Sequence, residues 1–249
     1  MLGWELRTST LATINKHLEA RPFHLEREHL RIAANDAADV KLCPRYVLKF
    51  HIAHCFDLFG ELIRAKQEYK RILDEYGKQS DEKTLPADIH SAVLRQSGWV
   101  SYRQSLSCAI EEKPKLINEA EMFLSSAVEV AKAAGLRHLA GQAQSFLGRI
   151  LSEQPSKEER AFDNLRAYID CGGGDANTWY CIGELYSKKG QPKDALQAFA
   201  CSVALDPTHI SSWVSVGQLY ESHKLFKFAL DCYKEAVKQS NLEGLCDPK

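Results

Sequence analysis

The chain has 249 residues, with 32 Lys and Arg against 33 Asp and Glu, so its formal net charge is −1. This balance argues against a nucleic-acid-binding protein, which normally presents a basic face, and a hydrophobic content of 45% argues against a disordered chain. No apolar stretch approaches the ~20 residues that cross a bilayer, and the N-terminus lacks the pattern of a secretion signal. We therefore expect a soluble, intracellular protein that contacts neither nucleic acid nor membrane directly.

Residues 1–45 fit a helical pattern only loosely, and we expect them to form a degenerate or partial copy of the helix pairs that follow. Three such pairs are predicted next, and each has a small residue on both of its helices. Small residues let the two helices of a pair approach closely. In the second pair we expect a long loop near residues 103–118. The small residues are Ala53 and Ala65, Gly98 and Ala120, and Gly148 and Ala161.

The last two helix pairs repeat each other at a spacing of 34 residues. This period and the residue types at these positions are typical of the tetratricopeptide repeat, a helix–turn–helix unit. A single unit cannot cover its own apolar face, so neighbouring units must stack. The sequence therefore predicts an all-α tetratricopeptide-repeat superhelix, an α-solenoid of five to six repeats. The positions are Trp179, Gly183, Tyr186, Ala195 and Phe199, then Pro207 as the end of that copy, then Trp213, Gly217, Tyr220, Ala229 and Tyr233.

We assign residues 46–243 to this array and residues 244–249 to a tail. Solenoids usually end in a polar capping helix, and no such helix follows the last repeat. The sequence thus suggests either a piece of a longer protein or a partner that covers the last face.

The sequence predicts no catalytic residue, no metal site and no bound cofactor in this chain. His51 and His54 share a helix face, but no third ligand follows at a fixed spacing. The Cys171–Asp175 segment is interpreted as a turn, with Asp175 near the cap of the next helix. None of the eight cysteines forms a C-x-x-C pair, and we expect them to be small buried hydrophobes.

A binding surface is the remaining possibility, because the first helix of each repeat lines the concave groove of such a superhelix. Arg95, Trp99, Arg103 and Arg149 predict a basic, aromatic patch in mid-groove, and Trp and Arg are enriched at binding hot spots. In the alternative interpretation, Trp99 packs against the long loop and the arginines are solvated. The predicted groove residues are Phe50, His54, Arg95, Trp99, Tyr102, Arg103, Gln142, Arg149, Tyr180, Glu184, Lys188 and Gln218.

Two parts of the array resemble the repeats of the UTX/UTY family of JmjC histone lysine demethylases. They are residues 175–222, with the phrase QPKDALQA, and residues 49–73, with the run FHIAH. The resemblance implies a nuclear protein whose repeats precede a JmjC domain, which uses Fe(II) and 2-oxoglutarate. This chain has no such domain, so the resemblance implies a docking platform without enzymatic activity. Its partners would be subunits of a COMPASS-type histone methyltransferase complex.

Other repeat proteins remain as alternatives. Cyc8-type transcriptional corepressors and O-GlcNAc transferases carry similar arrays. A cytosolic chaperone adaptor is a third possibility, but such a protein would need Lys and Asn where Phe50 and His54 stand.

Overall fold

The structure is a computed structural model that describes residues 44–76 and 85–245. The chain divides into two compact units, residues 1–48 and 49–249, and nearly all of the described residues belong to the second unit. The first expected copy, residues 1–45, lies almost entirely outside the described residues.

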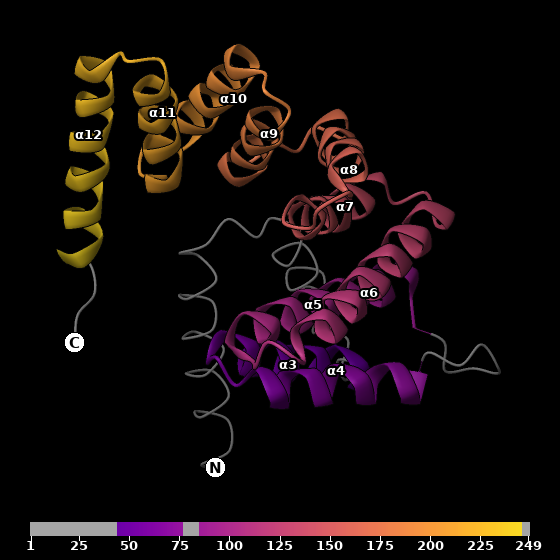
Figure 1. The fold of residues 1–249 in the computed structure, drawn as a ribbon. Helices are drawn as coiled ribbons and strands as arrows, with labels where there is room; N and C mark the ends of the chain where they lie inside the picture. Colours follow the sequence, from indigo (N-terminus) through magenta and orange to yellow (C-terminus); the bar gives the residue numbers. More distant parts are fainter. Residues whose placement is uncertain (1–43, 77–84, 246–249) are drawn as a thin grey trace, which may run out of the picture. The chain divides into compact units, whose positions relative to one another are not determined.

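Within these ranges the chain forms helices and their connections, and no strand (Figure 1). Successive helices pack as pairs, from α5–α6 to α11–α12. In the pair α3–α4, the rings of Phe50 and Tyr69 lie 5.9 Å apart. The predicted all-α tetratricopeptide-repeat fold is confirmed, with five helix pairs in the described part of the chain. The helices are α3 (Arg45–Leu58), α4 (Leu62–Tyr76), α5 (Ala87–Ser107), α6 (Lys113–Ala133), α7 (Arg137–Ser152), α8 (Glu158–Asp170), α9 (Ala176–Lys188), α10 (Pro192–Leu205), α11 (Ile210–Ser222) and α12 (Phe226–Leu245).

The small residues lie where the two helices of a pair meet. A Cβ atom added at Gly183 on α9 would come 2.5 Å from a ring carbon of Phe199 on α10. At Gly148 on α7 it would come 2.6 Å from Leu165 and 3.1 Å from the carbonyl oxygen of Ala161. These distances are far below van der Waals contact, so each pair depends on the missing side chain for its close approach.

The long loop expected near residues 103–118 is absent, and this expectation was wrong. Helix α5 continues to Ser107 and α6 begins at Lys113, so the connection is short and both helices have 21 residues. Pro114 lies in the first turn of α6. Proline is tolerated there because the first helical N–H groups have no partner within the helix. Pro114 therefore marks a helix start inside the range where the loop was expected.

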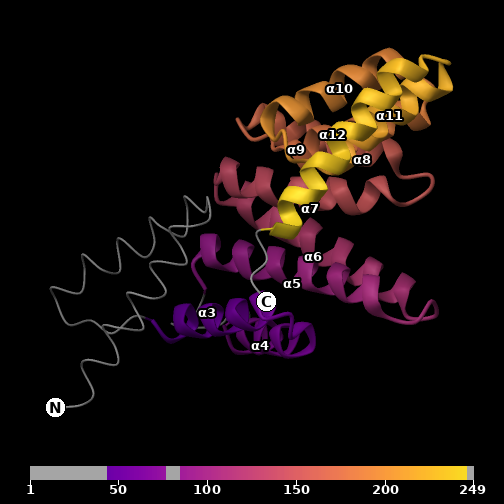
Figure 2. The ribbon, with the colours of Figure 1, turned by 90° about the vertical axis from the view of Figure 1, so that its left-hand side faces the viewer.

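The core continues from one repeat to the next. One apolar cluster includes buried residues of α5 to α10, among them Leu124, Leu151, Leu165 and Ile182. A second cluster joins α10, α11 and α12. Stacking of the pairs brings α5 against α7, and α7 against α9, as the view in Figure 2 shows for the successive pairs. The first helices of three repeats therefore form one continuous face.

The turns also repeat. Gly190 ends the α9 turn with φ of +70°, and Lys224, which is 34 residues later, ends the α11 turn with φ of +61°. A left-handed residue of this kind closes a helix C-terminus. At the start of α9, the Asp175 carboxylate accepts a hydrogen bond from the Thr178 N–H at 2.7 Å, as the interpretation of this turn predicts.

The cysteines differ from expectation. Of the six in the described ranges, Cys232 is buried, Cys55 is exposed and the others are half-buried, and none forms a disulfide. Within the same ranges, no helix combines the length and the apolar character that a bilayer crossing requires.

Candidate protein-binding face of the first helices

Four residues of α5 and α7 form an arginine–aromatic cluster: Arg95, Trp99, Phe146 and Arg149. The rings of Trp99 and Phe146 lie 4.7 Å apart. The Arg149 guanidinium lies 4.9 Å from the centre of the Trp99 ring, and that of Arg95 lies 5.6 Å from the centre of the Phe146 ring. Both cations are thus within cation–π distance of an aromatic face.

This cluster is less open than the predicted mid-groove patch. Arg95 is 8% exposed, and Trp99 is half-buried against the core cluster. Because α5 and α7 pack side by side, side chains between them meet each other rather than solvent. Trp99 therefore packs, as in the alternative interpretation, but against Phe146 of the next repeat rather than a loop.

Arg103 does not join the cluster, which corrects the predicted grouping. Its guanidinium forms an ion pair of 2.5 Å with Asp57 on α3. The Asp57 carboxylate is almost fully buried, and this burial raises its pKa although Arg103 and His54 lie nearby and oppose the shift. The pair thus connects the first two helix pairs.

Two further predicted groove residues are buried. Phe50 is inside the first helix pair, with its ring stacked on His54 at 6.3 Å. Tyr102 is buried, and its hydroxyl donates to Glu153 at 2.5 Å. Burial, followed by Glu153, raises the pKa of Tyr102. Neither side chain is available to a ligand in this arrangement, because packing already uses it.

Two cations remain available: Arg149 of the cluster and Lys188 on the next first helix. Arg149 is half-buried, and in the described part of the chain its guanidinium has no carboxylate partner. Lys188 is exposed on α9, and its ammonium donates to the Ser152 carbonyl oxygen at 2.6 Å. The Ser152 hydroxyl in turn donates to the Arg149 carbonyl at 2.7 Å. Ser152 therefore connects the Lys188 side chain on α9 with the backbone of α7 next to Arg149.

Cys181 lies near Arg149 but is not suited to nucleophilic chemistry. Burial raises the pKa of its thiol to about 11, although Arg149 and Ser152 act in the opposite direction. The thiol is therefore uncharged at neutral pH, and the thiolate is the reactive form.

Towards the last repeat the face loses its positive character. The Glu184 carboxylate on α9 accepts from the Ser215 hydroxyl on α11 at 2.9 Å. Burial and then the Glu184 charge raise the pKa of the neighbouring Tyr180. Gln218 on α11 is exposed, whereas Gln142 on α7 is half-buried and hydrogen-bonds His138 at 3.0 Å. The structure thus divides the predicted groove residues into a positive part and a neutral-to-acidic part.

Sequence reasoning missed Phe146, the ring that organises the arginine–aromatic cluster. It lies two residues before Gly148, and the same position holds His51, Gln96, Cys181 and Ser215 in the other described repeats. The internal repetition therefore carried no signal for an aromatic side chain at this position.

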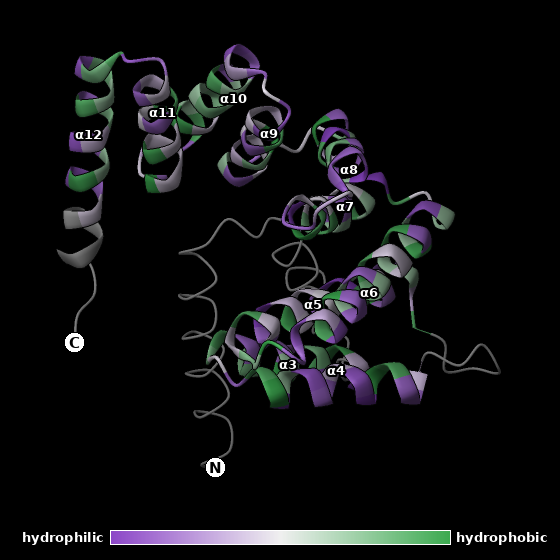
Figure 3. Ribbon diagram, in the orientation of Figure 1, coloured by the Kyte–Doolittle hydropathy of each residue, from purple (hydrophilic) through white to green (hydrophobic). Residues whose placement is uncertain are grey.

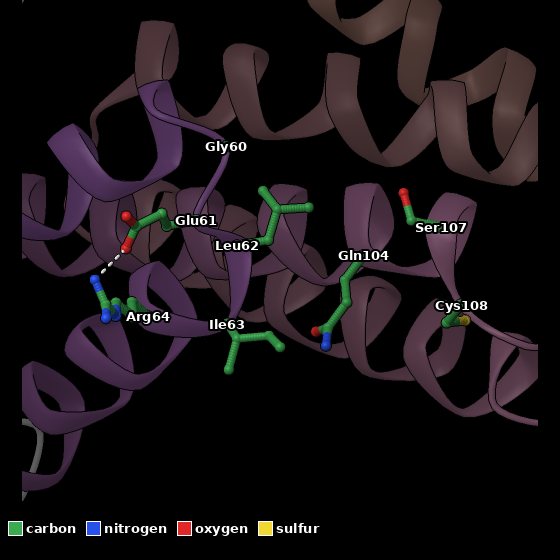
Figure 4. Close-up of a pocket in the computed structure, with 8 residues that line it drawn as sticks. All are labelled: Gly60, Glu61, Leu62, Ile63, Arg64, Gln104, Ser107 and Cys108. Atoms are coloured by element: carbon green, nitrogen blue, oxygen red, sulfur yellow. Dashed lines mark hydrogen bonds and ion pairs between the residues drawn. The ribbon is translucent and has the colours of Figure 1, made fainter.

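A pocket with a volume of about 630 Å³ lies elsewhere, between the start of α4 and the end of α5 (Figure 4). Its lining includes Ile63, Gln104 and Cys108, and Glu61 pairs with Arg64 at 2.7 Å at its edge. None of the predicted groove residues lines it. Among the described residues, no group of three or more His, Cys, Asp or Glu side chains is placed to hold a metal ion.

No protein-family model matches the chain. Three similar solved structures are MamA, MamA residues 41–end from Desulfovibrio magneticus RS-1, and YrrB, described as a TPR protein with an unusual peptide-binding site. For MamA the TM-score is 0.55 at 20% identity, with 78% of this chain and 96% of that chain covered. For the Desulfovibrio protein the TM-score is 0.59 at 15% identity, with 81% of this chain and 98% of that chain covered. For YrrB the TM-score is 0.51 at 18% identity, with 77% of this chain and 84% of that chain covered.

These similarities support the tetratricopeptide-repeat fold. They overturn the assignment to the UTX/UTY family, because these similar structures are MamA and YrrB proteins. The membership in a histone methyltransferase complex loses its support with that assignment. The nuclear location and the Fe(II) and 2-oxoglutarate of a further domain depended on the same resemblance and stay untested.

Proposed function

We propose that the chain is a protein-interaction scaffold that binds an acidic, extended segment of another protein along α7 and α9. The observation that carries this proposal is the pair Arg149 and Lys188, for which the described residues supply no ion-pair partner. The tetratricopeptide-repeat fold supports it, and so does the peptide-binding site named for YrrB.

Arg149 and Lys188 differ in the contacts that their side chains make. The Arg149 guanidinium is held over Trp99 and Phe146, so little side-chain entropy remains to be lost on binding. Its N–H groups match the two oxygens of a carboxylate. Lys188 adds a second, more exposed charge. The expected ligand is therefore a segment with at least two acidic side chains.

The experiment measures binding of a labelled peptide of alternating glutamate and leucine by fluorescence anisotropy. The comparison peptide has glutamine in place of glutamate. We expect the glutamate peptide to bind more tightly, with an affinity that falls as salt is added. Arg149→Gln should weaken binding at least about tenfold, which corresponds to about 1.4 kcal/mol, and Lys188→Gln should weaken it less.

Arg166→Gln is the matched control, because Arg166 is an exposed arginine on α8. Its binding should equal that of the wild type. Circular dichroism and melting temperature establish that each variant is folded. Equal binding of both peptides, or unchanged binding by both Arg149→Gln and Lys188→Gln, would contradict the proposal.

A further inference from the structure

The last helix of the array, α12, carries an exposed apolar stripe. Phe226, Leu230 and Val237 are 65%, 52% and 61% exposed. Their spacing of i, i+4 and i+11 places them on one side of the helix. The inward side of α12 packs on α11, where Cys232 joins the shared apolar cluster and Ala229 is buried. Figure 3 shows hydrophobic and hydrophilic residues in alternation along α12.

Helix α10, the second helix of the preceding repeat, shows what kind of element such a stripe contacts. Leu196 and Val203 of α10 stand 34 residues before Leu230 and Val237, and the residue types are the same. On α10 both side chains are half-buried, and Leu196 packs against the cluster that α10 forms with α11. The α12 stripe thus repeats a surface that accepts an amphipathic helix elsewhere in the same molecule.

The flank of the stripe differs between the two helices in charge. Lys234 and Lys238 on α12 replace Ala200 and Ala204 of α10. Both lysines are about two-thirds exposed, and among the described residues they pair with Asp231 and Glu235 of their own helix, at 3.8 and 3.1 Å. Exposed ion pairs of this kind contribute little to the free energy of folding. With the exposed Lys227, they form a row of positive charge beside the apolar stripe.

We propose that α12 is a second docking site, and that its occupant is an amphipathic helix of a partner protein with an acidic flank. The apolar side of that helix covers Phe226, Leu230 and Val237, and its carboxylates face the lysine row. A second copy of this chain fits less well, because two α12 helices packed antiparallel about a twofold axis would bring lysine rows together. The site is separate from the Arg149 face and does not depend on it.

The test uses the full chain and a labelled synthetic helical peptide. This peptide has leucine at i, i+4, i+7 and i+11, glutamate beside the leucines and alanine elsewhere. A counterpart has lysine in place of glutamate. We expect the glutamate peptide to bind, and the lysine peptide to bind at least about tenfold more weakly. The double variant Leu230→Ser, Val237→Ser should bind the glutamate peptide at least about tenfold more weakly than the wild type does.

Leu205→Ser is the matched control, since Leu205 is an equally exposed leucine at the end of α10, and it should bind as the wild type does. Because Leu205, Leu230 and Val237 are all exposed, both variants should have the melting temperature of the wild type. Arg149→Gln should also leave this binding unchanged. Unchanged binding by the α12 variant would overturn the proposal. So would a dimer, detected by light scattering, that the same variant dissociates, because a second copy would then occupy the stripe.

Discussion

Gly183 and Gly217 occupy the same position in successive repeats but face rings with different freedom to move. Gly183 faces Phe199, which is 1% exposed and enclosed by α9, α10 and α11. Gly217 faces Tyr233, whose hydroxyl donates to Glu221 at 2.8 Å near the surface. An added methyl group therefore meets a fixed ring in one case and a movable ring in the other.

We predict that Gly183→Ala lowers the free energy of unfolding by about 1–3 kcal/mol, because the ring of Phe199 cannot move away. Gly217→Ala should be close to neutral, since the Tyr233 ring can turn outwards and alanine is the better helix former by up to about 1 kcal/mol. Urea denaturation followed by circular dichroism measures both. Equal losses for the two variants would show that the surroundings of the ring do not decide the cost.

At the scale of single helices, the starts of α9 and α11 use different caps. The Asp175 carboxylate caps α9, whereas the neutral Nδ1 of His209 accepts from the Ser212 N–H at 3.3 Å at the start of α11. Burial lowers the pKa of His209, although Asp206 and Asp175 oppose this shift. A protonated ring would also lose the lone pair that accepts the bond.

We predict that acid destabilises α11 through His209. Its pKa is lower in the folded chain, so the unfolded chain binds more protons below about pH 6.5. The free energy of unfolding should therefore fall as the pH drops from about 7.5 to about 5.5. His209→Asn keeps a capping side chain and should reduce this fall, which urea titrations at both pH values can measure. Some pH dependence should remain, because burial also lowers the pKa of His90. If the free energy of unfolding of His209→Asn falls as much as that of the wild type, the acid sensitivity does not come from His209.

At the scale of the whole array, burial is uneven. One apolar cluster of the described residues joins α5 to α10, whereas α12 packs on α11 and exposes Phe226, Leu230 and Val237. In a solenoid each repeat is stabilised mainly by its neighbours. A repeat with fewer buried contacts should therefore open more often than one inside the stack.

We predict that native-state hydrogen exchange is slowest in α7 and α8 and faster in α12, the difference reflecting local opening. Leu165→Ala, which removes a fully buried side chain of α8, should cost about 2–5 kcal/mol and accelerate exchange in α7 and α8 more than in α12. Mass spectrometry of peptic fragments resolves these regions. A uniform increase across all helices would indicate a single cooperative unit instead.

The sequence by itself determined the repeating unit of this protein. A period of 34 residues with Gly or Ala at fixed positions specifies where two helices meet, because no larger side chain fits there. The positions of these small residues follow from the sequence of each repeat alone, so they could be recognised without knowing how the repeats pack. The sequence was sufficient for the all-α fold, the pairing of helices and the position of the cap at Asp175.

Only the tertiary structure decided which side chains remain available for binding. The burial of Trp99 depends on Phe146, about 50 residues later in the chain, and Arg103 is neutralised by Asp57 of an earlier helix pair. The loop expected near residues 103–118 is instead mostly helical, because α5 and α6 pack together and both extend into this range. Such outcomes depend on which residues of one repeat meet those of the next, and the pattern within a single repeat does not contain that information.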